Sequence, residues 1–139
     1  MSLMSIDGLE FDHIGIAVSN LDACNNYLSS FSDMIMISEM FRDVNQNIKI
    51  SFADFYGVKV ELIEPLNKKK KSPVDKYLEK NITYYHICFR TMSLEDTISK
   101  MEDKGALVVI EPINAVAFNN KKIAFLLLKH LGLIELLEK

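Results

Sequence analysis

Two histidines and two glutamates recur at matching places in the two halves of this 139-residue chain, and both residue types bind divalent metal ions. His13 and His86 each stand third in a β-like run. Glu61 follows the first histidine by 48 positions, and Glu135 follows the second by 49. These offsets predict an internal repeat of roughly seventy residues whose four side chains converge on one ion at a pseudo-twofold axis.

Imidazole nitrogens and carboxylate oxygens together suit cobalt, nickel, manganese, iron or zinc. Four protein ligands on a six-coordinate ion leave two positions open for a substrate. A carbonyl or thioester oxygen bound there is polarised, so the neighbouring C–H bond becomes more acidic. A simpler explanation exists for each residue alone, since a strand histidine often serves only as a hydrogen-bonded core residue. The joint pattern favours the metal.

Each half is predicted to run strand, helix and then three strands. The predicted helix starts are 19–22 and 93–96, where a serine is followed three residues later by an acid. Apolar stripes follow, and Gly105 is placed to end the second helix. The later strands are expected at 35–41, 48–55 and 58–64 in the first half, and at 107–110, 122–129 and 131–138 in the second, with a tight turn at 56–57.

Strand alternation predicts that the candidate ligands face away from the helices. The apolar residues that alternate with the ligands along each strand would then face the helices. These are Ile14, Ile16 and Val18 beside His13, Val60 and Leu62 beside Glu61, Ile87 and Phe89 beside His86, and Ile134 and Leu136 beside Glu135.

The pattern predicts an α+β fold in a single domain over residues 8–139. Module one is expected at about 11–66, a linker with a short helix at 67–81, and module two at about 82–139. Residues 1–3, which precede the second methionine Met4, are expected to be an expression remnant. The open strand edges of such small sheets favour a homodimer.

The composition narrows the class of protein further. A net charge of −3 gives no sign of a nucleic-acid surface, and no apolar run is long enough for a membrane span or signal peptide. Cys24 and Cys88 lack the spacing of a disulfide framework, so both are predicted to be reduced thiols in a cytoplasmic protein. The run Lys68–Lys71 reads as a solvated linker, with attraction to the phosphates of a CoA or nucleotide as the alternative.

Several segments resemble the vicinal oxygen chelate superfamily, which includes glyoxalases, bleomycin resistance proteins and dioxygenases. The matching segments are DHIGIAV at 12–18, VELIEP at 60–65, SPVDKYLEKN at 72–81, HICFR at 86–90 and IAFL at 123–126. They are most similar to the branch of methylmalonyl-CoA epimerases and lactoylglutathione lyases. The resemblance implies two paired βαβββ modules whose curved mixed sheets surround a central metal and substrate cavity, with the helices outside.

The resemblance also implies functional roles. The implied metal ligands are His13, Glu61, His86 and Glu135, and Glu135 is the implied catalytic proton acceptor. The implied substrate is a small carbonyl compound or thioester of the acyl-CoA or glutathione type.

Three departures from the epimerase pattern matter. Epimerases commonly have glutamine at the place of Glu61, whereas lyases use glutamate. Asn45 stands where epimerases have a glutamate that resembles a general base, and an amide cannot accept a proton at neutral pH. Asp43 and Glu39 are the nearby carboxylates. The stretch 114–118 also lacks the expected glycine-rich loop.

These features leave three hypotheses open. The first is a metal-dependent isomerase or lyase that transfers a proton next to a carbonyl. The second is a protein of the same fold that sequesters a small molecule or antibiotic, although such relatives generally lack the four ligands. A ring-cleaving dioxygenase comes third, because only His130, which is predicted to lie in a turn, remains as a spare histidine.

Overall fold

A computed structural model describes residues 5–139, so the expectation for residues 1–3 lies outside the described residues. This part of the chain contains nine strands and three α-helices, and none of these helices is long and apolar enough to cross a membrane. The chain divides into two compact units. We call His13–Tyr85 the N-terminal unit, and residues 5–12 with His86–Lys139 the C-terminal unit. The prediction of one domain over 8–139 stays a prediction.

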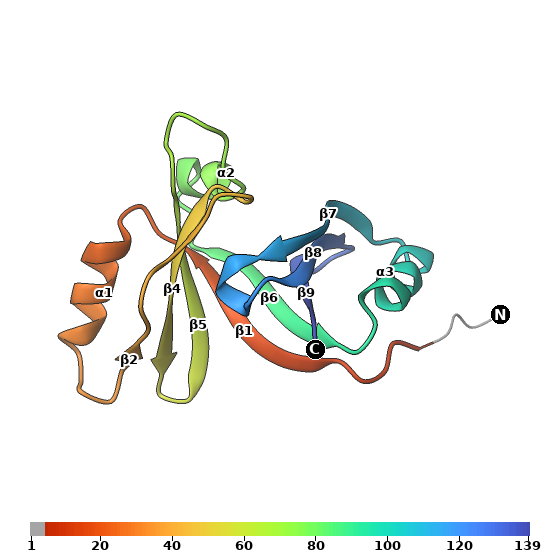
Figure 1. Ribbon diagram of the computed structural model, residues 1–139, viewed down its shortest axis with the longest axis horizontal. Helices are drawn as coiled ribbons and strands as arrows, with labels where there is room; N and C mark the ends of the chain where they lie inside the picture. The colour runs from red at the N-terminus through yellow and green to blue at the C-terminus, as the bar shows by residue number, and fades with distance from the viewer. Residues whose placement is uncertain (1–4) are drawn as a thin grey trace. The chain divides into compact units, whose positions relative to one another are not determined.

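The N-terminal unit is a mixed sheet with a helix on one face. Its elements are the main part of β1 (Glu10–Ala17), α1 (Leu21–Ser29), β2 (Met36–Ile37), β3 (Phe41–Asp43), β4 (Ile48–Phe55), β5 (Val58–Pro65) and α2 (Asp75–Glu79). The strand order is β2-β4-β5-β1, with β3 also paired to β4. β1 and β5 are parallel and the other pairs are antiparallel. In Figure 1, α1 lies beside β2, β4 and β5.

The C-terminal unit repeats this plan. Its elements are β6 (Tyr84–Thr91), α3 (Leu94–Asp103), β7 (Leu107–Ala115), a 3-10 helix η1 (Val116–Phe118), β8 (Lys121–Leu128) and β9 (Gly132–Glu138). The strand order is β6-β9-β8-β7, and β6 pairs with β9 in parallel. Helix α3 packs against β7, β8 and β9 (Figure 1). The predicted α+β class and the duplicated strand-helix-strands plan are confirmed.

Most of the predicted helix-facing residues are confirmed, since seven of the nine pack in the apolar clusters under the helices. Ile14 and Ile87 are partly exposed and are not among the residues of these clusters. Under α3, a cluster of eight buried residues joins the helix stripe to β8 and β9: Leu94, Ile98, Met101, Ala106, Ala124, Leu126, Ile134 and Leu136. Under α1, only Leu21, Ala53 and Leu62 are buried, with Ile16, Val18 and Val60 packed around them. Phe31 continues the apolar spacing of Leu21 and Leu28 in the sequence, but it is exposed because α1 ends at Ser29.

The structure has the predicted hairpin turn between β4 and β5 and the predicted end of the second helix at Gly105. Tyr56 and Gly57 join β4 to β5 with φ angles of 54° and 92°, which is the backbone of a tight hairpin turn whose two central residues have positive φ. Gly105 follows α3 with φ 91°, as expected of a residue that ends a helix.

Two predicted strands are wrong in extent. The strand expected at 35–41 is interrupted, because three residues, 38–40, lie opposite only two residues of β4 and form a bulge between β2 and β3. The strand expected at 107–110 continues to Ala115 through Pro112. β7 is an edge strand, where a missing backbone donor is tolerated.

Candidate metal centre

The N-terminal unit holds His13 and Glu61 side by side. β1 and β5 are parallel, with Gly15 paired to Glu61, so His13 stands two residues before the partner of the glutamate. Its Nε2 lies 3.4 Å from Glu61 Oε1, and their side chains are 0% and 4% exposed. The ring of Phe52, which pairs with Glu61 across β4, meets the histidine ring edge-on at 5.9 Å.

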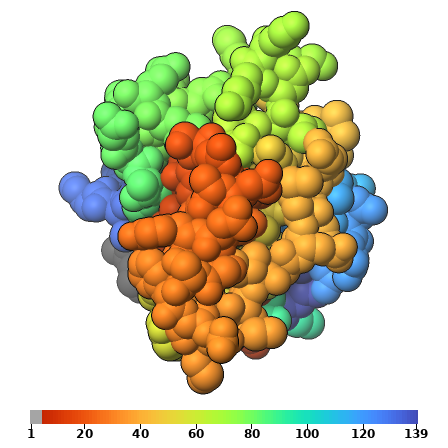
Figure 2. All heavy atoms as spheres, turned by 90° about the vertical axis from the view of Figure 1, so that its left-hand side faces the viewer, coloured from red at the N-terminus to blue at the C-terminus, as the bar shows by residue number. Residues whose placement is uncertain are grey.

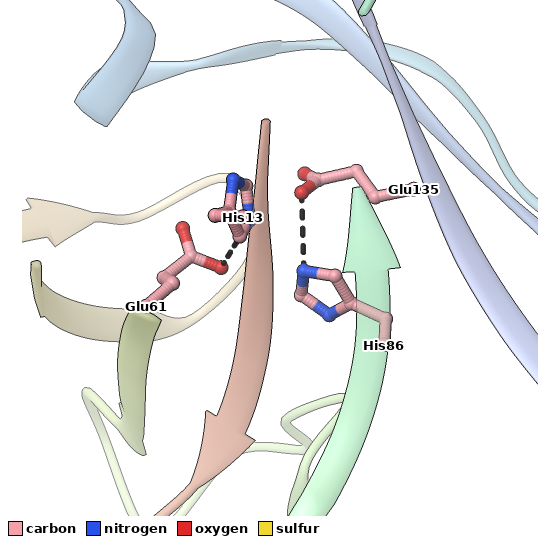
Figure 3. Close-up of side chains that lie close together, drawn as sticks. All are labelled: His13, Glu61, His86 and Glu135. Carbon is pink, nitrogen blue, oxygen red and sulfur yellow. Dashed lines mark ion pairs between the residues drawn. The ribbon is translucent and has the colours of Figure 1, made fainter. Parts of the chain in front are cut away.

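The C-terminal unit holds His86 and Glu135 in the same way (Figure 3). β6 and β9 are parallel, with Cys88 paired to Glu135, so His86 also stands two residues before the glutamate's partner. Its Nε2 lies 3.2 Å from Glu135 Oε1, and the side chains are 0% and 3% exposed. Phe125, which pairs with Glu135 on β8, meets the histidine ring edge-on at 5.1 Å.

The two phenylalanines are part of the repeat that sequence reasoning missed. Phe52 and Phe125 are 73 positions apart, which is also the separation of His13 and His86. Each unit therefore presents a histidine, a glutamate and a phenylalanine in one strand register. Comparing the predicted strands 48–55 and 122–129 at the histidine offset is the signal that finds them.

The donor set of each pair fits a divalent metal. Burying a carboxylate costs several kcal/mol unless a charged or hydrogen-bonding partner compensates, and each carboxylate here has an imidazole nitrogen beside it. An imidazole nitrogen and a carboxylate oxygen are ligands that borderline divalent ions accept. Both pairs also lie on the sheet face opposite the helix, since their strand neighbours pack under α1 and α3.

The surroundings of the two pairs differ in charge. In the N-terminal unit, Lys59 Nζ lies 4.6 Å from the centre of the Phe52 ring, as a cation–π contact. The backbone N–H of Phe52 donates to Ser38 Oγ at 2.8 Å, so the bulge after β2 fixes the strand position of this phenylalanine. In the C-terminal unit, Leu133 stands two residues before Glu135, as Lys59 stands two residues before Glu61, and it is buried and apolar.

Asn45, at the place of the expected base, and the two nearby carboxylates lie in different surroundings. Asn45 is exposed in the turn between β3 and β4, and Glu39 is exposed in the bulge. Asp43 is fully buried, and its two carboxylate oxygens accept from Gln46 N at 3.1 Å and Gln46 Nε2 at 2.9 Å. The Asp43 carboxylate therefore organises the turn.

The spare histidine, the two cysteines and the lysine run have no part in either pair of histidine and glutamate. His130 is exposed in the turn between β8 and β9 with φ 63°, which confirms the predicted turn histidine. Cys24 and Cys88 are free thiols, and burial raises the pKa of the Cys24 thiol. Lys68–Lys71 are exposed in the loop after β5.

Comparison with known proteins gives a consistent picture. The family model described as "Glyoxalase/Bleomycin resistance protein/Dioxygenase superfamily" matches residues 12–125. The uncharacterized protein YqjC of Bacillus subtilis is 30% identical over 116 residues, which is 83% of this chain and 80% of that protein.

Solved structures are similar over nearly the whole chain. The hypothetical protein BH1468 from Bacillus halodurans has a TM-score of 0.80 at 28% identity, covering 96% of both chains. A Streptomyces coelicolor methylmalonyl-CoA epimerase variant in complex with 2-nitronate-propionyl-CoA has a TM-score of 0.77 at 26% identity, covering 93% of this chain and 96% of that one. A methylmalonyl-CoA epimerase in complex with methylmalonyl-CoA and NH4+ has a TM-score of 0.76 at 28% identity, covering 93% of each.

Proposed function

Because the chain belongs to the glyoxalase/bleomycin resistance protein/dioxygenase superfamily, we propose that it is a metal-dependent isomerase or lyase that moves a proton next to a carbonyl. The observation that carries this proposal is the duplicated buried pair of histidine and glutamate in one strand register. The proposed ligands of a single divalent ion are His13, Glu61, His86 and Glu135. Cobalt, nickel, manganese, iron and zinc all suit this donor set.

The proposed chemistry is proton abstraction by Glu135. When bound, the ion would act as a Lewis acid that makes the hydrogen next to the substrate carbonyl more acidic. The Glu135 carboxylate accepts that proton, so the C–H bond breaks, an O–H bond forms and the electron pair stays on the substrate as an enolate. The proton then returns to the substrate or exchanges with water, which restores the carboxylate.

The proposed substrate class is a thioester or a thiohemiacetal. The epimerase structures that resemble this chain contain 2-nitronate-propionyl-CoA or methylmalonyl-CoA, which supports an acyl-CoA thioester. Glu61, in place of the glutamine that epimerases commonly have, supports the lyase type of ligand set.

A single base is proposed, and inversion of a carbon centre is therefore not expected. Asn45 cannot accept a proton, Asp43 is held by Gln46, and Glu39 is exposed in the bulge. One base can exchange a substrate proton with solvent or return it to a neighbouring carbon. It cannot readily protonate the opposite face.

The test combines metal analysis with deuterium exchange. Protein purified without chelator is expected to hold about one divalent ion per chain, and His86→Ala to hold almost none. In D2O, NMR would follow deuterium entry into methylmalonyl-CoA and into the thiohemiacetal of methylglyoxal and glutathione. The matched control is His130→Asn, because asparagine tolerates the left-handed backbone of that turn.

The outcomes separate the candidate functions. Metal-dependent exchange that His86→Ala loses and His130→Asn retains supports the proposal. Stoichiometric metal without exchange on either substrate class points to sequestration instead. Rapid racemisation of methylmalonyl-CoA would contradict the single-base assignment.

We also propose that the protein works as a cytoplasmic homodimer. The strands β2 and β7 are unpaired on one side within their units, and β7 exposes Leu107 and Val109. Sedimentation velocity is expected to give twice the 15.9 kDa mass of the chain, and a monomer at every concentration would contradict this.

A further inference from the structure

The segment that follows β5 concentrates positive charge. Residues 68–80 contain six lysines, one aspartate and one glutamate, although the whole chain carries a net charge of −3. Four of these lysines form the lysine loop, Lys68–Lys71, and all four are exposed. Figure 2 shows the segment near residue 70, in yellow-green, standing out on the surface of the N-terminal unit. Such a concentration favours an anionic partner.

The side-chain amide of Asn47 gives the lysine loop a fixed backbone. Its Nδ2 donates to the carbonyl oxygens of Asn67, Lys70 and Lys71 at 3.0, 3.2 and 3.0 Å. Its Oδ1 accepts from Asn67 N at 2.9 Å, and its backbone oxygen accepts from Leu66 N at 3.2 Å. Both ends of the loop are therefore tied to a single residue.

Asn47 belongs to a turn that is itself hydrogen-bonded to a buried side chain. Asn47 has φ 54°, a left-handed backbone that asparagine tolerates better than most residues. Asp43 holds the same turn through its two bonds to Gln46. Lysine side chains presented from an ordered loop lose less backbone entropy on binding than those of a flexible tail.

The lysine loop follows directly after the strand that carries Glu61, which is one of the proposed metal ligands. β5 carries Glu61 and ends at Pro65, and the tied loop begins directly afterwards. At the rise of a β-strand, six residues from Glu61 to Asn67 span ~20 Å. The pantetheine arm of CoA, which joins the thioester to the phosphates, has a comparable extended length.

We propose that the lysine loop binds the phosphates of an acyl-CoA, which makes a CoA thioester the substrate. This inference rests on the proposed function and decides between its two substrate classes. The 3′-phosphate and diphosphate of CoA offer several negative charges to lysine side chains, whereas glutathione carries no phosphate. Because the lysines are exposed, the attraction is expected to weaken steeply with salt.

The experiment measures binding of free CoA, 3′-dephospho-CoA and pantetheine by isothermal titration calorimetry to the full chain. The test variant changes all four lysines of the loop to glutamine. The matched control changes four exposed lysines of the C-terminal unit to glutamine: Lys104, Lys121, Lys122 and Lys129. We expect the test variant to bind CoA about tenfold more weakly and the control to bind within about twofold of wild type. Pantetheine affinity is expected to stay unchanged in both.

A second variant separates loop order from loop charge. Asn47→Gly keeps every lysine and accepts the positive φ, but it removes the amide that ties the loop. We expect CoA affinity to fall about threefold and the salt dependence to be retained. Circular dichroism and thermal melting check that each variant is folded.

Equal CoA affinity in wild type and the loop variant would overturn the proposal. An equal loss of CoA affinity in the loop variant and the control would overturn it as well. RNA binding that depends on the loop, with no CoA binding, would also overturn it in favour of a nucleic-acid surface. Loop-dependent CoA binding without any proton exchange supports the loop and contradicts the proposed reaction. Exchange on the glutathione thiohemiacetal without CoA binding supports the proposed reaction and contradicts the proposed role of the lysine loop.

Discussion

The two units present the same histidine, glutamate and phenylalanine but hold their helices in different ways. In the C-terminal unit, α3 packs by apolar contact, with Leu94, Ile98 and Met101 buried on the strands and with Ile6 and Leu9 packed around them. In the N-terminal unit, α1 buries only Leu21. The strand register of the pairs is nevertheless equivalent. The parallel strand pairs therefore position the proposed ligands, and the helix attachment is free to vary.

Polar contacts replace apolar packing around α1. The backbone N–H of Leu21 donates to Glu64 Oε1 at 2.6 Å, and Glu64 Oε2 lies 3.4 Å from Lys49 Nζ. Asn20 caps the helix by accepting from Ala23 N at 2.9 Å. A buried carboxylate on β5 thus ties the first turn of the helix to the strand that carries Glu61, as an anion at a helix N-terminus does favourably.

The largest expected effect tests whether the two glutamates are functionally equivalent. Glu135→Gln is expected to lower proton exchange about a thousandfold, because the amide cannot accept the proton. Glu61→Gln is expected to lower the rate of proton exchange less than about tenfold. An oxygen ligand remains, and the epimerases that this chain resembles commonly have glutamine there. Initial rates of deuterium entry, measured at equal metal occupancy, give the comparison.

Equal losses in the two variants would contradict this assignment, because both glutamates would then act only as ligands. A larger loss from Glu61→Gln would move the proton acceptor to the N-terminal unit. Metal content measured on the same samples separates lost binding from lost proton transfer.

The next effect concerns stability and sharpens the contrast in packing. Leu136→Ala is expected to lower the free energy of unfolding by about 4 kcal/mol, because Leu136 belongs to a cluster with seven other buried residues. Leu62→Ala is expected to cost about 2 kcal/mol, since its cluster has only two other buried residues and the partly exposed neighbours can relax inward. Urea unfolding followed by circular dichroism measures both, and a reversed order would contradict the packing argument.

A smaller effect tests the polar attachment of α1. Glu64→Ala is expected to cost about 1–3 kcal/mol, because the N–H of Leu21 would lose its buried acceptor. Glu64→Gln keeps an acceptor oxygen and is expected to cost less. The matched control is Glu102→Ala on the exposed surface of α3, with a change within about 0.5 kcal/mol. Equal costs for Glu64→Ala and Glu102→Ala would show that the contact adds nothing.

The repeat and the helix-facing stripes were predictable because they follow local periodicity. Ser93 begins α3 as expected, with its side chain accepting from Asp96 N. In the first half, however, the cap is Asn20 and not the predicted Ser19, because Glu64 from β5 already occupies the first free N–H. A contact that spans 43 positions leaves no signal in a local window.

The other features that the sequence did not predict also depend on contacts between segments far apart in the chain. The bulge at 38–40 depends on Ser38, whose backbone N–H donates to Phe52 O while its hydroxyl accepts from Phe52 N. The extension of β7 through Pro112 depends on the strand being an edge, which only the sheet order reveals. The role of the Asn47 amide likewise depends on a loop some twenty positions away.

The smallest expected effect lies at an ion cluster of the C-terminal unit that the N-terminal unit does not repeat. Glu10 Oε1 lies 2.7 Å from Lys139 Nζ, and Glu10 Oε2 lies 3.2 Å from Arg90 Nη2. The hydrogen bond and charge of Lys139, with a further contribution from Arg90, lower the pKa of Glu10 below its ordinary value of 4.5. A lowered folded-state pKa means that the stabilisation is complete above the ordinary value and is lost as pH falls through the lowered one. Glu10→Gln should therefore melt slightly below wild type at about pH 7, with the gap closing as pH falls through the lowered pKa and also in high salt. A gap that widened in acid would show that the Glu10 carboxylate is not stabilised by these cations.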